Sequence, residues 1–432
     1  MTTPPPAVLP HAAPVTLPPP PRPRVGPVPV ASRAVAPDVA RGLALLGIAI
    51  ANAVVHLAGG AVGLGLRPVD SSTLDRTVDG VVSLLVDRRT MPMFALLYGY
   101  GIGVVVRRRA AAWVPWPACR ADLLRRAALL VAFGVAHVLL LFEGDILGAY
   151  GLTGLLAVAF VRASDRALLV TSATVLVASG VVGGAMNGAI VLQEVFLGEP
   201  FVIPVEESPL AALATRALSG LFGAPLGAFI ALPLVLLGMW GARRSVLERP
   251  ADHVRLLRRT AVVGLAVSVV GAAPFATAVA RLRDPSTGDA IGSAILHEVT
   301  GAAGGVAFAA LVGWVVAARG TTTATLGPVG RALRAVGTRS LTCYLLQSVL
   351  FVLPLAAWAG GLGRDMGSAQ VVAWAVGVWL VTVAVAVALE AAGRRGPAEW
   401  LYRRLVYGRS TASPSAAVTD GQPAPEARPL SG

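Results

Sequence analysis

Residues 125–154 of this 432-residue chain read RRAALLVAFGVAHVLLLFEGDILGAYGLTG. The stretch predicts two apolar helices, over residues 125–142 and 146–161, joined by a very short acidic connection at Glu143 to Asp145. His137 falls inside the first of these helices. Because an ionisable group inside an apolar span costs a few kcal/mol or more to insert, its presence needs a reason. His137 is therefore the first candidate for a functional residue.

The composition sets the class of protein. Hydrophobic residues make up 55% of the chain, charged residues only 14%, and the mean hydropathy is +0.72. Apolar runs of roughly 17 to 25 residues are long enough to cross a bilayer as helices, and their continuity disfavours a membrane barrel. The sequence thus predicts an all-α, polytopic integral membrane bundle of about ten transmembrane helices. The expected spans are 41–64, 90–106, 125–142, 146–161, 167–190, 221–241, 260–280, 300–318, 338–359 and 370–392.

The formal charge of +13 would suggest nucleic acid as the partner of a soluble protein. Here the arginines cluster in alternate connections, at residues 107–126, 162–166, 243–259 and 319–339, and near the C-terminus. The intervening connections are acidic or balanced. By the positive-inside rule this alternation places both termini in the cytoplasm and the acidic connections outside. The expected partner is the lipid bilayer of a cytoplasmic membrane, with no role for nucleic acid.

Three regions are expected along the chain. Residues 1–35 are rich in proline and predict a disordered cytoplasmic tail, residues 36–409 form the transmembrane helical domain, and residues 410–432 form a second disordered tail. Between the first two spans, residues 74–89 predict an amphipathic helix on the outer membrane surface. The two cysteines provide no metal-binding spacing and no disulfide framework.

The first span carries a polar stripe. At 100° per residue, Asp38, Arg41, Asn52 and His56 fall within a narrow arc, with charge at the cytoplasmic end and an amide and imidazole further out. Alternatively, Asp38 and Arg41 are an interfacial pair and Asn52 joins two helices by a hydrogen bond.

His137 also has two interpretations. As a functional group it would be a general base or a transient acyl acceptor, oriented by Asp145 or Glu143. As a structural group it would be a neutral histidine that is hydrogen-bonded to a neighbouring helix.

Five segments resemble the YeiB-like family of bacterial membrane proteins, domain of unknown function 418. They are PDVARGLALLGIAIAN in the first span, RRTMPMFALLYGYG in the second, the stretch quoted at the outset, TRSLTCYLLQS in the ninth, and RRGPAEWLYRRLVYGR near the C-terminus. That family is in turn similar to the transmembrane acyltransferase superfamily, whose members move acyl groups from cytosolic thioesters onto glycans or other acceptors. Many of those enzymes carry a histidine at the position of Asn52, so in this chain His137 or His56 would have to act instead.

The resemblance implies acyl transfer to a hydroxyl acceptor at the membrane. His137 would take the hydroxyl proton, Asp145 would hold its tautomer, and Asn52 or Gln347 would donate to the developing oxyanion. The expected catalytic residues are His137, Asp145, Asn52 and His56, and the expected substrate-binding residues are Asp38, Arg41, Arg89, Glu143 and Gln347. Acyl-CoA would be a co-substrate entering among the basic loops, the acceptor would be a glycan or lipid, and neither a bound cofactor nor a metal is expected.

Two other classes of function remain open. A transporter or exporter would use the polar stripe and His137 to line a proton or solute path. A non-catalytic membrane scaffold would use the same groups for packing alone. The sequence leaves the oligomeric state open.

Overall fold

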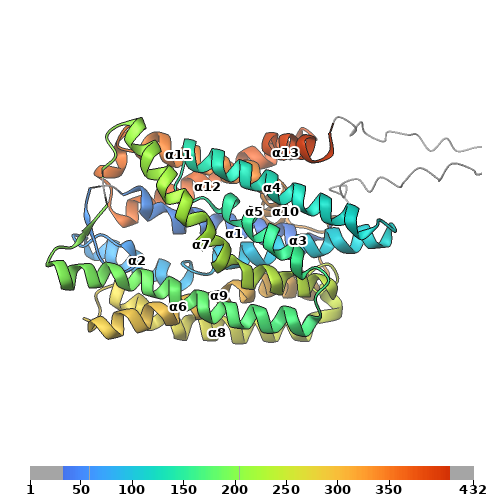
Figure 1. Ribbon diagram of the computed structural model, residues 1–432, viewed down its shortest axis with the longest axis horizontal. Helices are drawn as coiled ribbons and strands as arrows, with labels where there is room; N and C mark the ends of the chain where they lie inside the picture. The colour runs from blue at the N-terminus through green and yellow to red at the C-terminus, as the bar shows by residue number, and fades with distance from the viewer. Residues whose placement is uncertain (1–32, 58, 204, 409–432) are drawn as a thin grey trace, which may run out of the picture.

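A computed structural model describes residues 33–57, 59–203 and 205–408. The two predicted tails, apart from residues 33–35, lie outside these residues. Within them the chain is helical, apart from one pair of two-residue antiparallel strands (Figure 1). The α-helices are α1 (Val35–Ala53), α2 (Thr73–Leu85), α3 (Thr90–Ala111), α4 (Trp116–Leu140), α5 (Ile146–Phe160), α6 (Asp165–Leu197), α7 (Pro209–Arg243), α8 (Val254–Val279), α9 (Thr287–Ala318), α10 (Pro328–Thr338), α11 (Ser340–Leu355), α12 (Ser368–Ala391) and α13 (Pro397–Tyr407). Strands β1 (Ala61–Val62) and β2 (Phe201–Val202) pair with each other, and short 3-10 helices lie at Val54–His56, Leu64–Leu66, Pro250–His253 and Leu362–Arg364.

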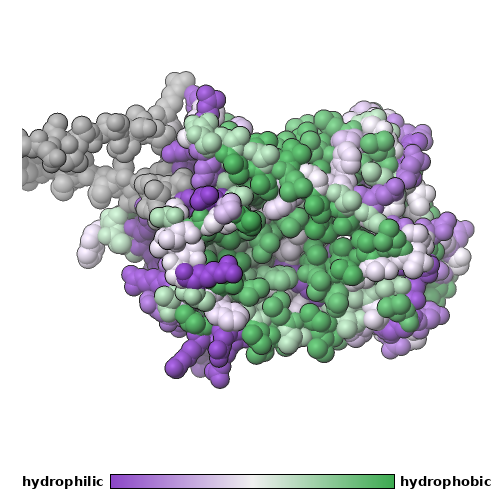
Figure 2. All heavy atoms as spheres, turned by 180° about the vertical axis from the view of Figure 1, so that it is seen from behind, coloured by the Kyte–Doolittle hydropathy of each residue, from purple (hydrophilic) through white to green (hydrophobic). Residues whose placement is uncertain are grey.

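The predicted fold class is confirmed. Among the described residues, eight helices are long and apolar enough to cross a membrane, or nine if α10 and α11 count as one broken span. Each of the ten predicted spans contains a helix, but α5 has only 15 residues, and a full crossing takes about 20. The chain is a multi-pass membrane protein. Figure 2 shows the corresponding apolar belt between two hydrophilic ends.

The helices form a bundle with a central group between two outer ones. Figure 1 shows α6, α8 and α9 side by side along one edge, and α4, α11 and α12 along the opposite edge. Between them lie α1, α3 and α7, whose side chains form much of the buried core, including Leu45, Ile48, Met93, Leu97 and Val235.

The hairpin of α4 and α5 forms as its sequence predicts. α4 ends at Leu140 and α5 begins at Ile146, with the acidic connection between them. The two helices touch backbone to backbone, because a Cβ atom at Gly134 would overlap the main chain of Gly148. This close approach needs glycine at the crossing and fixes the tip of the hairpin against its stem.

The amphipathic segment between the first two spans is helical as expected, but it packs within the protein. α2 begins with a capping box at Ser72 and Asp75, and the face that carries Gly80 and Val82 is buried, with α8 and α12 as neighbours. Leu74 and Val81 remain exposed.

The ninth span is broken. α10 and α11 meet at an angle of 86° between Thr338 and Ser340. The break leaves the first N–H groups of α11 without helical partners, and Glu399 of α13 supplies the acceptor: its carboxylate accepts from the backbone N–H groups of Leu341, at 2.7 Å, and Thr342, at 3.1 Å. The C-terminal helix therefore caps α11.

Candidate functional site

His137 is held between two polar partners from different helices. Its Nδ1 lies 2.8 Å from Oδ1 of Asp145, and its Nε2 lies 2.8 Å from Oγ of Ser348 on α11. The histidine is 3% exposed and Ser348 is 5% exposed. The predicted proximity of His137 and Asp145 is confirmed. The contact between His137 and Ser348 was not predicted from the sequence.

The chemistry of the three groups sets the direction of the hydrogen bonds. An ionised carboxylate only accepts, so Nδ1 of His137 carries the proton and donates it to Asp145. Nε2 then has a free lone pair, and the Ser348 hydroxyl donates to it. The serine, histidine and aspartate thus form a chain in the order found in activated serine nucleophiles.

Asp145 is also the N-cap of α5, and this second role holds its side chain in place. Its carboxylate caps α5 by accepting from the backbone N–H groups of Leu147, at 3.0 Å, and Gly148, at 2.6 Å. A capping carboxylate is held in one rotamer and is favoured by the positive end of the helix dipole. The sequence predicted the role of Asp145 beside His137 but not this cap.

Tyr344 and Gln347, which are also on α11, lie next to the group formed by Ser348, His137 and Asp145. The Tyr344 ring centroid lies 5.0 Å from that of His137, and its hydroxyl accepts from the backbone N–H of Ile146. Gln347 is buried, and its Nε2 donates to the carbonyl of Leu45 at 3.5 Å, a long hydrogen bond. The structure therefore brings Gln347 to the helix that carries Ser348, with its amide weakly engaged.

A pocket of about 300 Å³ lies toward the arginine-rich end of the bundle. Arg41 and Arg126 line it together with Ser340 and the aromatic residues Tyr98 and Tyr402. We call it the inner pocket. All five segments that carry the family resemblance contribute to its wall. Ser340 lies two helical turns, about 12 Å, before Ser348 on the same helix.

Arg41 keeps its predicted pairing with Asp38. Its Nη1 lies 3.1 Å from Oδ1 of Asp38, and its Nη2 donates to the carbonyl of Leu97 at 3.1 Å. None of the hydrogen bonds or ion pairs of Asp38 and Arg41 involves His137, whose partners are Asp145 and Ser348. The predicted stripe is thus divided between the two ends of the bundle.

A second pocket, of about 140 Å³, lies toward the other end. We call it the outer pocket. His56 and Glu143 line it. The His56 ring is stacked between Phe142 and Phe351, at centroid distances of 5.1 and 4.9 Å. Asn52 is half-buried near the end of α1, four residues before His56, which lies in the 3-10 helix that follows. Burial, together with the charge of Glu206, raises the pKa of Glu143 above its ordinary value.

Arg89 lies in a different buried cluster, where α2 meets α3. Its guanidinium donates to the backbone carbonyls of Ser83, Asp87 and Ser268. Nearby ion pairs join Arg67 to Asp79 and Asp87, and Arg88 to Glu298. The structure therefore separates Arg89 from the other predicted binding residues.

His297, for which the sequence predicts no role, lies beside this cluster. It is 2% exposed, and neither ring nitrogen has a hydrogen-bond partner among the described residues. Its ring instead stacks on Phe275 at 4.5 Å.

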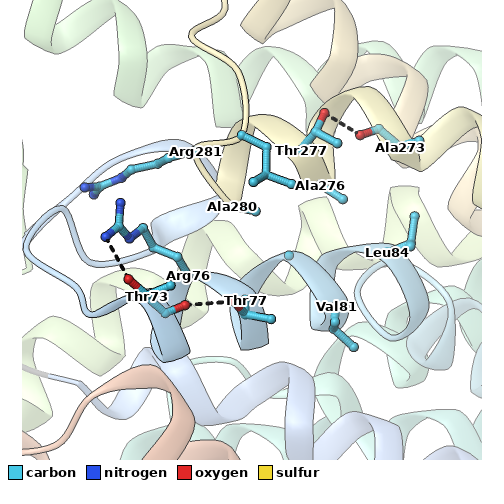
Figure 3. Close-up of a pocket in the computed structure, with 12 residues that line it drawn as sticks. Thr73, Arg76, Thr77, Val81, Leu84, Ala273, Ala276, Thr277, Ala280 and Arg281 are labelled. Carbon is cyan, nitrogen blue, oxygen red and sulfur yellow. Dashed lines mark hydrogen bonds between the residues drawn. The ribbon is translucent and has the colours of Figure 1, made fainter.

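A further groove of about 380 Å³ separates α2 from α8. Figure 3 shows Arg76 and Arg281 at one end of it and Val81 and Leu84 further along. None of the predicted site residues lines this groove. The described residues contain no group of three or more histidine, cysteine, aspartate or glutamate side chains arranged to hold a metal.

The sequence did contain a signal for Ser348. Ser340, Tyr344 and Ser348 recur every four residues in the ninth span, which places three hydroxyls on one face of an apolar helix. That periodicity identifies a polar face on α11, and the structure turns it toward His137.

The fold defines the class, a multi-pass membrane protein, and comparisons with known proteins give its relatives. A family model described as "Protein of unknown function (DUF418)" matches residues 241–409. The chain is 24% identical over 406 residues to the uncharacterized protein YxaH of Bacillus subtilis (strain 168), covering 86% of this chain and 93% of that protein. It is 25% identical over 391 residues to the uncharacterized protein YeiB of Escherichia coli (strain K12), covering 85% and 94%. These matches support the resemblance seen in the sequence, and the printed names carry no activity.

Proposed function

We propose that this protein transfers an acyl group from a cytosolic acyl thioester to a hydroxyl acceptor at the membrane, with Ser348, His137 and Asp145 as its reactive groups. The observation that carries the proposal is the chain of two 2.8 Å contacts from Ser348 through His137 to Asp145. A structural histidine needs partners, but it does not need a hydroxyl on one nitrogen and a carboxylate on the other.

The chemistry proceeds in two balanced steps. Ser348 Oγ attacks the thioester carbonyl while Nε2 of His137 takes its proton, and collapse of the tetrahedral intermediate breaks the C–S bond and returns that proton to the thiol. An acceptor hydroxyl then attacks the acyl-serine, again losing its proton to His137, and Ser348 leaves as the free hydroxyl. Asp145 stabilises the imidazolium formed in each step.

The donor enters through the inner pocket. The phosphate groups of an acyl thioester such as acyl-CoA favour guanidinium partners, and Arg41 and Arg126 both line this pocket. The acyl end points along α11 toward Ser348. Tyr344 lies between, so its side chain moves to admit the acyl carbonyl.

Gln347 supplies the oxyanion donor in this scheme. Its amide makes only a long bond to Leu45, so little is lost when it turns to a developing negative charge. Asn52 and His56 lie on the outer side of the site and approach the acceptor rather than the donor.

The test is covalent labelling from radiolabelled long-chain acyl-CoA, using purified protein in phosphatidylcholine nanodiscs. We expect label on Ser348, located by peptide mass, and we expect Ser348→Ala to remove it and to lower turnover by about 10³-fold or more.

Ser172→Ala is the matched control. Ser172 is also a buried serine, and its hydroxyl donates only to the carbonyl of Pro233, at 2.8 Å. The control should retain both label and turnover. Transfer that survives Ser348→Ala unchanged would remove Ser348 as the nucleophile. Protein that neither binds acyl-CoA nor becomes labelled, yet carries a proton-dependent flux in proteoliposomes, would replace acyl transfer with transport.

A further inference from the structure

The outer pocket lies one helical turn beyond the reactive groups. Leu141 and Val352 line it, four residues after His137 and Ser348; Leu141 directly follows the end of α4, and Val352 lies on α11. The axial distance is therefore about 6 Å. His56 and Phe142 also line the pocket, and the His56 ring stacks between Phe142 and Phe351. A molecule in the outer pocket is thus about one helical turn from Ser348.

The outer pocket contains polar hydrogen atoms without an acceptor. Arg216 is 5% exposed, and its Nε has no hydrogen-bond partner among the described residues. Oε2 of Glu143 lies 4.0 Å from this Nε, too far for a hydrogen bond. The indole N–H of Trp358, over whose ring Arg216 lies at 5.4 Å, has no described partner either. Buried donors in this state cost free energy that a bound acceptor atom would restore.

The same pocket also offers acceptors. Glu143 and Glu206 both line it, so donors and acceptors face one another across a small space. A hydroxyl group is both donor and acceptor, and several hydroxyls on one molecule would meet both kinds of partner. One arginine faces two carboxylates, so the pocket has no excess of positive charge that would select an anionic ligand. The buried arginine repels a cationic ligand.

The volume of the outer pocket and the residues that line it restrict the choice of ligand further. A volume of about 140 Å³ equals the space of about five waters in the liquid. The apolar part of the wall, with Val55, Leu57 and Leu355, suits the C–H faces of a compact ring or chain. One sugar ring or one glycerol unit meets both requirements.

We infer that the outer pocket is the acceptor subsite, and that its ligand is a small polyol with adjacent hydroxyls, carried on a sugar or on a lipid glycerol headgroup. This inference rests on the proposed acyl transfer for its meaning. It adds that donor and acceptor approach Ser348 from opposite ends of the bundle, so the acyl group crosses the protein between the inner and outer pockets. Arg216 binds the acceptor and takes no part in forming the acyl-serine.

The first experiment measures binding without turnover. Ser348→Ala protein in phosphatidylcholine nanodiscs is titrated with octyl glucoside below its micellar concentration, with a monoacylglycerol, and with octyl phosphocholine, which lacks hydroxyls. The readout is the tryptophan fluorescence that is lost in Trp358→Phe. We expect saturable binding of one or both hydroxylated ligands and none of octyl phosphocholine. Equal binding of all three, or of none, would overturn the inference.

The second experiment separates the two steps. We expect Arg216→Gln and Glu206→Gln to keep the acyl label on Ser348 and to lower its transfer to the preferred polyol by tenfold or more. Glu206 lies in a connecting segment, so its variant should fold even if loss of the buried Arg216 is not tolerated. Arg281→Gln, in the groove of Figure 3, is the control and should leave both steps unchanged.

The outcomes distinguish the two proposals. Polyol binding without any label on Ser348 would support the outer pocket and contradict acyl transfer. Label on Ser348 with transfer that is insensitive to Arg216 and Glu206 would support acyl transfer and contradict the assigned subsite.

Discussion

The two buried histidines of the membrane domain show that burial alone does not indicate function. His137 and His297 are 3% and 2% exposed, and each lies in a long apolar helix near an acidic residue. Yet both ring nitrogens of His137 have partners, whereas neither nitrogen of His297 has one among the described residues. The difference is in what the neighbouring helices present: α11 turns hydroxyls toward His137, whereas α8 turns the ring of Phe275 toward His297.

The carboxylate next to His297 is already engaged elsewhere. Glu298 pairs with Arg88 at 2.7 Å and makes no hydrogen bond to the His297 imidazole. Asp145, by contrast, serves His137 and the N-terminus of α5 at once. An acidic residue close to a histidine in the sequence therefore indicates a functional pair only when its carboxylate contacts the imidazole.

The largest expected effect comes from Asp145. In Asp145→Asn an amide oxygen still caps α5, but the amide no longer fixes the imidazole tautomer, so turnover should fall by about 10⁴-fold with little change in stability. Asp145→Ala should lose the same activity and in addition about 1 kcal/mol of the cap. Acyl transfer rates and thermal unfolding of the two variants are compared. Equal unfolding temperatures would show that Asp145 does not act as a cap.

The next largest effect concerns the stability provided by His137. His137→Phe removes the partner of both Ser348 and the Asp145 carboxylate within a buried site, and we expect a loss of about 3 kcal/mol in the free energy of unfolding. Thermal unfolding in detergent measures it. A loss below about 1 kcal/mol would mean that the two hydrogen bonds are readily replaced.

The hairpin crossing should show a smaller effect. A methyl group at Gly134 meets the backbone of Gly148 and the Asp145 carboxylate, so Gly134→Ala should cost about 1 to 3 kcal/mol and shift Asp145 from His137. Gly223→Ala is the control, because a Cβ there meets nothing within 4 Å. The control should be neutral or slightly stabilising. A neutral Gly134→Ala would contradict the close approach of α4 and α5.

The smallest effect is expected at His297, where the comparison is sharpest. His297→Phe keeps the stacking on Phe275 and removes two unpaired ring nitrogens from the interior, so stability should stay within about 0.5 kcal/mol or rise. Acyl transfer should be unchanged. A loss comparable to that of His137→Phe would show that His297 has a polar partner of equal weight.

Much of the fold could be predicted from local pattern. Apolar runs place a helix at each of the ten predicted spans because the bilayer imposes both length and hydrogen bonding within each segment. The break before Ser340 could not be predicted in this way: Gly337 precedes it, but a single glycine does not by itself end a helix, and Glu399, which caps α11, lies far along the chain.

The candidate site could be predicted only where its members are close in sequence. His137 and Asp145 are eight residues apart across a tight turn, so their meeting follows from the hairpin. Ser348 lies 211 residues beyond His137, and Arg216 belongs to yet another helix. Their positions depend on how the helices pack around one another, which hydrophobic periodicity does not specify.

The cap on α11 bears on how the chain is made. Glu399 follows Leu341 by 58 residues, so the ninth span leaves the ribosome well before the residue that completes its first turn. During that interval the N–H groups of Leu341 and Thr342 depend on water or lipid headgroups for partners. The N-terminal turn of α11 therefore reaches its final geometry only after the last helix has been synthesised and has folded back, and chains that end before α13 stop short of it.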